Sequence, residues 1–286
     1  GEGGRGGEVV ALLAPRLRVE ERQLMAAFAS RGWDASLRSL DDIAVLLQRE
    51  SGLPALIVDR GVATHDRAVF AALAPPSSVV VNRAATTRLL ADRLAFTRHM
   101  LIAGVPVPET AVGFGEQGTL RALEQVGYPA SLAALQTDAS KPDAVLHDTD
   151  AAESIVEHRA MLGHETTVLV QRLVPGNHLR VAVVGVDIVG AEAVTVDARG
   201  MTRYEPVGPL APSIERMAQQ IVARLGSGVY EIRVTEGVSG PVVTSAGNLV
   251  DFRTLTAAGM DVAGRIADFA LAQQRSDSRE LVAQHG

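Results

Sequence analysis

The chain has 286 residues, a formal net charge of −6 and no cysteine, and it is 47% hydrophobic but only 3% aromatic. The length predicts one large domain or two to three smaller ones. The negative charge, with no block of basic residues, argues against a nucleic-acid-binding protein. The absence of cysteine excludes disulfides and thiolate metal sites.

The first residues of the chain, 1–7, are rich in glycine and contain a G-x-G-x-x-G string. This string precedes the first expected strand, whereas a dinucleotide-binding turn follows a strand and opens a helix. We therefore interpret it as a flexible lead-in. No stretch resembles a signal peptide or reaches the length of a membrane span, so we expect a cytoplasmic protein that does not bind membranes.

Strand and helix patterns alternate over the beginning of the chain. In order, a strand, a helix, two strands, a helix and a strand are predicted at residues 9–13, 20–30, 34–38, 55–58, 65–73 and 79–81. The alternation is typical of a parallel sheet covered by helices. We expect an N-terminal α/β domain over residues 8–82.

The remainder of the chain mixes helices with clustered strands. Helices are predicted at residues 86–103, 118–126, 150–161, 213–225 and 259–273, with Asp150 and Ser213 as N-caps. Strands are predicted at residues 110–114, 130–135, 168–174, 179–184, 188–194, 229–234 and 242–244. We expect a central subdomain over residues 83–167, a C-terminal subdomain over residues 168–275 and a frayed tail over residues 276–286.

Twelve short sequence strings, spread over almost the whole chain, each resemble a segment of one known protein family. They are residues 16–21, 82–84, 91–97, 104–110, 150–153, 157–159, 170–171, 179–181, 184–185, 198–200, 251–253 and 259–264. In this order they resemble the ATP-grasp superfamily, and within it the LysX and RimK branch of ATP-dependent carboxylate–amine ligases. No single string is diagnostic; their joint order carries the resemblance.

The resemblance implies an α/β fold of the α+β ATP-grasp kind. An N-terminal parallel-sheet domain would precede two α+β subdomains that enclose a nucleotide cleft. It also implies a reaction in which ATP phosphorylates a substrate carboxylate and an amine then attacks the acyl phosphate. Such a transfer needs cations around the phosphates and Mg²⁺ held by oxygen ligands.

The resemblance also implies which residues would contact the nucleotide. A hinge of four consecutive residues would read adenine through its backbone, and four basic residues would face the phosphates. These candidates are Arg93, Lys141, Gln171, Arg172, Leu173, Val174, Arg180 and Arg199. Whether the chain binds ATP therefore stays an open question.

The positions that would carry the metal chemistry are substituted. Ala133 stands where the resemblance implies a phosphate-binding lysine, and Arg233, Ser245 and Gly247 stand where it implies oxygen ligands of the metal. A guanidinium cannot ligate Mg²⁺ and would repel it. We therefore assign no catalytic residue and no metal ligand, and the substitutions argue against Mg²⁺ as a cofactor.

Three functions stay open. The first is a degenerate ligase that acts as a binding or scaffolding partner in amino-acid or peptide ligation, with an active ligase paralogue or an acidic amino-group carrier protein as its partner. The second is an active carboxylate–amine ligase whose rearranged metal site uses Glu236 or Asp251. The third is a metal-independent nucleotide or anion sensor, in which Arg233 replaces the cation.

Two further expectations follow from motif context and base rates. A hydrolase centred on Ser245 is disfavoured, because the string around it lacks the first glycine of G-x-S-x-G and no triad partner is evident. A homo-oligomer, most often a dimer, is the base-rate expectation for assembly.

Overall fold

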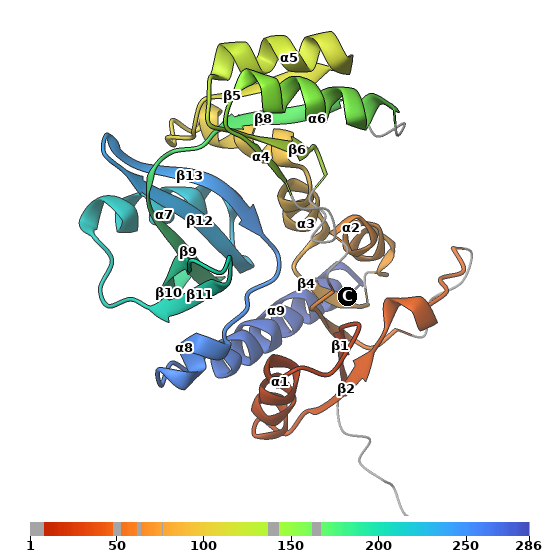
Figure 1. Cartoon of the computed structure of the whole chain (residues 1–286). Helices are drawn as coiled ribbons and strands as arrows, with labels where there is room; N and C mark the ends of the chain where they lie inside the picture. The colour runs from red at the N-terminus through yellow and green to blue at the C-terminus, as the bar shows by residue number, and fades with distance from the viewer. Residues whose placement is uncertain are drawn as a thin grey trace, which may run out of the picture.

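The computed structural model describes residues 9–47, 53–61, 64–75, 77–136, 143–161 and 167–285. The predicted mixed α/β fold is confirmed: the chain builds one parallel and two antiparallel sheets (Figure 1). The predicted lead-in and Lys141 lie outside the described residues. None of the helices in the described part of the chain is both long and apolar enough to cross a membrane.

The N-terminal sheet is parallel, with the strand order β2-β1-β3-β4. Its strands are β1 (Val9–Leu13), β2 (Asp34–Arg38), β3 (Leu56–Asp59) and β4 (Val79–Val81). Helices α1 (Val19–Ala29) and α9 (Val262–His285) pack together on one face, while α2 (Thr64–Leu73) contributes Phe70 to the core on the other face. The last helix of the chain thus covers the first sheet.

The C-terminal sheet is antiparallel, with the order β11-β10-β9-β12-β13. Its strands are β9 (Gly176–Gly185), β10 (Asp187–Val196), β11 (Thr202–Pro206), β12 (Gly228–Gly237) and β13 (Gly240–Gly247). Helix α7 (Pro212–Leu225) packs Met217 and Ile221 against Ile232 and Val234 of β12. Because side chains alternate along a strand, the residues between them face the opposite side, which we call the inner face.

The central sheet is antiparallel and has a core of its own. Its order is β5-β8-β6-β7, formed by β5 (Thr110–Phe114), β6 (Ala130–Ala134), β7 (Ala144–Leu146) and β8 (Thr167–Arg172). Helices α5 (Gly115–Val126) and α6 (Thr149–Met161) share this core, and the unit forms the upper lobe in Figure 1. Strand pairing places β8 in the central sheet, between β5 and β6. The predicted domain boundaries stay a prediction.

The single helix predicted over residues 86–103 is wrong. The chain forms α3 (Ala84–Ala91) and α4 (Arg93–Ile102), separated by Asp92 in an extended conformation. A carboxylate oxygen of Asp92 accepts the amide of Ala95 at 2.9 Å, so this residue caps α4. The same residue forms an isolated bridge with Gln136, and this contact beyond β6 is a tertiary effect that the helical pattern does not reveal.

Several smaller predictions are also wrong. Helix α7 begins with Pro212 and has Ala211, not Ser213, as its N-cap. In α6, the capping carboxylate is that of Asp148, not Asp150, and it accepts a hydrogen bond from the amide of Ala151. Strands β7 and β11 and the short helix α8 (Arg253–Ala257) were not predicted; β11 is exposed along its whole length, so no apolar alternation marks it. Helix α9 continues to His285 through the predicted tail.

Candidate functional site

The positions that the resemblance implies as metal ligands lie side by side on the inner face of the C-terminal sheet. Strand pairing places Arg233 of β12 opposite Ser245 of β13, and Glu231 opposite Gly247. On its other side, β12 pairs with β9, which brings Arg180 opposite Arg233. The three positions that the resemblance implies as ligands therefore converge, and a guanidinium, a hydroxyl and a hydrogen atom occupy them.

A network of ion pairs covers this part of the inner face. Arg233 donates from Nε and Nη2 to Oε1 of Glu231, at 3.0 and 2.8 Å. Arg180 donates from Nε to Oε2 of Glu192 at 2.8 Å and lies 3.7 Å from Oε2 of Glu231. We call these four residues the inner-face network: Arg180, Glu192, Glu231 and Arg233.

The network is sealed at one end and open at the other. The side chains of Glu192 and Glu231 are 1% and 4% exposed, whereas that of Arg233 is 62% exposed. Burial raises the pKa of Glu231, although Arg233 and Arg180 offset part of the shift. Burial alone would lower the pKa of Arg180, but Glu231 and Glu192 outweigh it, so this pKa is raised. The guanidinium of Arg180 stays charged and committed to its carboxylates.

A hollow of about 210 Å³ opens beside the network. Its lining includes Arg180, Arg233, His178 and Thr235, with Tyr204 from β11 at its rim. The ring of Tyr204 lies 4.1 Å from the guanidinium of Arg180, close enough for a cation–π contact. The ring Nδ1 of His178 lies 2.9 Å from Oγ1 of Thr235. The polar groups that line the hollow thus come from β9, β11, β12 and β13.

The donor set does not fit a divalent metal. Mg²⁺ requires oxygen ligands in octahedral geometry, and the convergent positions offer one hydroxyl and one carboxylate that already accepts two hydrogen bonds from Arg233. Within the described ranges, no group of three or more His, Cys, Asp or Glu residues could hold a metal ion. We derive no step through Mg²⁺.

The hinge predicted to read adenine consists of the last two residues of β8, Gln171 and Arg172, and of the next two, Leu173 and Val174. The amides of Arg172 and Leu173 donate to the carbonyls of Glu109 and Pro129, at 2.8 and 2.9 Å. The Gln171 amide nitrogen donates to Oγ1 of Thr110, and Arg172 donates to the carbonyl of Val126. These groups hold the hinge in place. Among the described residues the amide of Val174 has no hydrogen-bond partner, so the backbone there is available to a base.

The remaining cationic candidates lie apart from the network. Arg93 begins α4 and binds both carboxylate oxygens of Asp143, at 2.9 and 2.7 Å, where β6 leads toward residues 137–142. Arg199 is exposed in the turn between β10 and β11, and its guanidinium makes no contact with the described residues. Ala133 is buried in β6. The roles assigned to these residues stay predictions.

Sequence reasoning missed the carboxylates of the network. These carboxylates are Glu192 and Glu231, and neither is among the predicted site residues. Both are buried, charged residues in otherwise apolar stretches of strand. Because a buried charge requires a partner, that feature is the signal that could have identified them.

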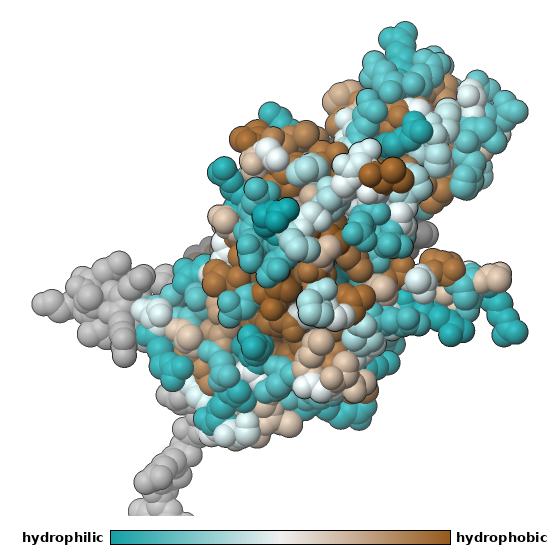
Figure 2. All heavy atoms as spheres, turned by 90° about the vertical axis from the view of Figure 1, so that its left-hand side faces the viewer, coloured by the Kyte–Doolittle hydropathy of each residue, from teal (hydrophilic) through white to brown (hydrophobic). Residues whose placement is uncertain are grey.

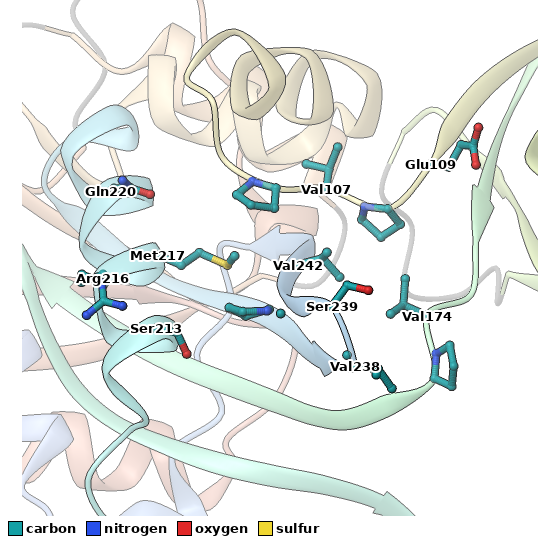
Figure 3. Close-up of a pocket in the computed structure, with 16 residues that line it drawn as sticks. Val107, Glu109, Val174, Ser213, Arg216, Met217, Gln220, Val238, Ser239 and Val242 are labelled. Carbon is teal, nitrogen blue, oxygen red and sulfur yellow. The ribbon is translucent and has the colours of Figure 1, made fainter.

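A second hollow, of about 610 Å³, lies beside the hinge (Figure 3). The close-up shows Met217 and Gln220 of α7 on one wall, Val107 above, and Val174 of the hinge on the other side. Residues 106–109 and 174–175, which flank the two ends of the central sheet unit, both contribute to the lining. Figure 2 shows apolar side chains gathered in the middle of the face to the left in Figure 1, with hydrophilic ones around them.

The fold matches solved structures along nearly its whole length. A RimK-domain ATP-grasp protein from Sphaerobacter thermophilus is 47% identical with a TM-score of 0.84, over 91% of this chain and 98% of that one. The ATP-grasp ligase PsnB, complexed with a phosphomimetic variant of its minimal precursor, Mg and ADP, has 15% identity and a TM-score of 0.72, over 94% and 100% of the two chains. D-alanine–D-alanine ligase from Bacillus anthracis, complexed with ATP, has 11% identity and a TM-score of 0.72, over 95% and 99%. No protein-family model matches.

Proposed function

Because this chain belongs to the ATP-grasp family, we propose that it is a degenerate ligase, which keeps the fold but does not run Mg²⁺-dependent phosphoryl transfer. The observation that carries the proposal is the contact between Arg233 and Glu231. The cation of Arg233 stands at a position where the resemblance implies a ligand of the metal ion. Bound Mg²⁺ would be repelled by Arg233 and would find too few oxygen ligands.

The rearranged-ligase alternative receives less support from the geometry. Glu236 lies three residues beyond Arg233 along β12, or about 10 Å at the rise of a strand, and it pairs across to Pro241 at the hairpin end. The backbone carbonyl of Asp251 accepts a bond from Arg180, so Asp251 lies near the network. At the converging positions it would add one carboxylate to that of Glu231, which already accepts two bonds from Arg233.

The proposed role is that of a binding or scaffolding partner in amino-acid or peptide ligation. An active ligase paralogue and an acidic amino-group carrier protein are the two partner classes. The net charge of −6 favours the paralogue, because an acidic carrier would be repelled at long range. PsnB, of the same fold, has been solved with its precursor peptide.

The proposal is tested by measuring ADP formation from ATP and Mg²⁺. The wild-type chain should form no ADP above the protein-free rate, with or without added glutamate and a primary amine. ADP formation that depends on both Mg²⁺ and the carboxylate would refute the proposal.

A variant with restored ligands provides the matched comparison. In the triple variant Arg233→Asp, Ser245→Glu and Gly247→Asn, the three oxygen ligands would converge again. A Cβ at position 247 would lie 3.9 Å from Cγ of Glu231, an ordinary contact, so the asparagine fits. We expect this variant, and not the wild type, to be stabilised by Mg²⁺ in a thermal-shift titration.

A further inference from the structure

We infer that Arg233 takes the place of the divalent cation, so that the inner face binds the phosphates of a nucleoside di- or triphosphate without any metal. This inference rests on the proposed function and names the ligand of the same site. It goes beyond a loss of catalysis, because it assigns Arg233 the role of binding the phosphates of a nucleotide.

The first argument is the way in which Arg233 is held. Both of its bonds to Glu231 come from Nε and Nη2 and go to one oxygen, Oε1. A guanidinium has five N–H donors in a rigid planar fork, so one edge is anchored while Nη1 stays available. The buried carboxylate therefore orients the cation, and the exposed part of the side chain lies where a ligand can reach it.

The second argument is the charge of the network. Two arginines and two glutamates cancel formally: Arg180, Arg233, Glu192 and Glu231. A carboxylate site that awaits Mg²⁺ is negative until the ion arrives and would repel free phosphates. Here an approaching polyphosphate meets the cationic, exposed end of the network at Arg233, while the carboxylate of Asp251 acts on Arg180 and Glu231. An added Mg²⁺ ion is not needed to screen the site.

The third argument is the hollow next to Arg233. Its lining includes His178, Thr235 and Thr244. The Thr244 hydroxyl donates to the carbonyl of Arg233, and Oγ1 of Thr235 contacts Nδ1 of His178, so Nε2 of His178 is the lining nitrogen left to meet a phosphate oxygen beside Arg233. A volume of about 210 Å³ suits the phosphate end of a nucleotide instead of the whole molecule. The base would then reach toward the hinge, where the amide of Val174 has no partner in the described part of the chain.

The inference is tested by calorimetric titration of the full chain with ADP, ATP and inorganic pyrophosphate, each in EDTA and in excess Mg²⁺. We expect ADP and ATP to bind in EDTA, and Mg²⁺ to leave the affinity unchanged or weaker. Arg233→Met keeps the length of the side chain and removes the charge. It should weaken ADP binding in EDTA by about tenfold or more, as expected for a charge-assisted bond to phosphate.

Arg121→Met is the matched control, since Arg121 is an exposed arginine of α5 without a side-chain contact to the described residues. It should leave ADP affinity unchanged. Equal ADP affinity in Arg233→Met and wild type would overturn the inference, as would the absence of binding in EDTA.

The outcomes separate this inference from the proposed function. If no nucleotide binds under any condition, the inference fails and the degenerate-ligase proposal stands. If nucleotides bind only with Mg²⁺ and ADP then forms, both fail, because a working metal site must exist. If nucleotides bind in EDTA, Arg233→Met loses them and no ADP forms, both hold.

Discussion

The inner-face network has a counterpart at the junction between the N-terminal sheet and the loop after β13. There Arg60, which follows β3, donates from Nε to Oε1 of Glu21 at 3.1 Å and from Nη1 to the carbonyl of Val250 at 2.7 Å. Arg18 binds the same glutamate, with Nη2 2.8 Å from Oε1. The guanidinium of Arg60 also lies over the ring of Phe252, 5.2 Å from its centroid. This junction cluster thus joins the start of α1 to the C-terminal part of the chain.

The two clusters differ in what they leave exposed. In the junction cluster, the side chains of Glu21 and Arg60 are 0% and 2% exposed, so they contact only each other and neighbouring protein groups, and a ligand cannot reach them. In the inner-face network, Arg233 retains an exposed edge beside a hollow. Sealed ion pairs are expected to govern stability, whereas the half-open network is expected to govern ligand binding.

The largest effect on stability is expected from Glu21→Gln. The substitution removes the carboxylate of a buried pair and leaves Arg60 charged in a place where water cannot reach it. Breaking one side of such a pair costs about 3–5 kcal/mol. Urea denaturation of the wild type and the variant measures the loss.

Glu124→Gln is the control for this substitution, because Glu124 is exposed on α5 and makes no side-chain contact with the described residues. Its free energy of unfolding should stay within about 0.5 kcal/mol of the wild type. Equal stability of the two variants would mean that the junction cluster does not hold the N-terminal sheet to the C-terminal part.

A smaller, pH-dependent effect is expected from Glu20, which is buried beside the junction cluster. Neither of its carboxylate oxygens accepts a hydrogen bond from the described residues, and the guanidinium of Arg253 lies 3.5 Å away. Burial raises the pKa of Glu20, and its interaction with the carboxyl of Asp251 raises it further. For Asp251, burial is outweighed by the interaction with Glu20 and by nearby arginines, so its pKa is lowered. The pKa values of the two neighbouring carboxyls are thus shifted in opposite directions.

The sign of the pH dependence follows from these directions. A carboxyl group with a raised pKa in the folded state stabilises the fold below its ordinary pKa, and this contribution is lost as the pH rises through the raised value. Glu20→Gln is neutral at every pH and can still donate to Asp251. The melting temperature of the variant, relative to wild type, should therefore increase from about pH 5 to about pH 8. A constant difference would show that the pKa of Glu20 is not raised.

The sequence allowed part of the candidate site to be predicted and not the rest. The substitutions at Arg233, Ser245 and Gly247 could be located, because β12 and β13 form a hairpin and local order places them together. The partners of Arg180 could not be located in this way. Its pair with Glu192 depends on a register shift between Ile188 and Gly190, which alters the pairing of β9 with β10. Its contact with Glu231 depends on the long-range pairing of β9 with β12.

The break between α3 and α4 has a similar origin. The helical pattern continues across Asp92, and only the bridge from that residue to Gln136 shows why the chain is extended there. Periodicity reports which face of an element is buried. It does not report which distant segment will pair with the backbone, and both the network and the break depend on such pairing.

The smallest stability effect among these substitutions is expected from Arg233→Met. This variant tests most directly whether the inner-face network differs from the junction cluster in governing ligand binding instead of stability. The side chain of Arg233 is 62% exposed, and Glu231 keeps Arg180 at 3.7 Å after the substitution. Arg233 itself is screened by water, but the buried Oε1 of Glu231 loses both of its bonds, so we expect a loss of about 1–2 kcal/mol, well below that of Glu21→Gln in urea denaturation. The same variant should lose ADP affinity in EDTA. If it instead destabilises the fold as strongly as Glu21→Gln, Arg233 is a structural partner of Glu231, and its exposed edge is incidental.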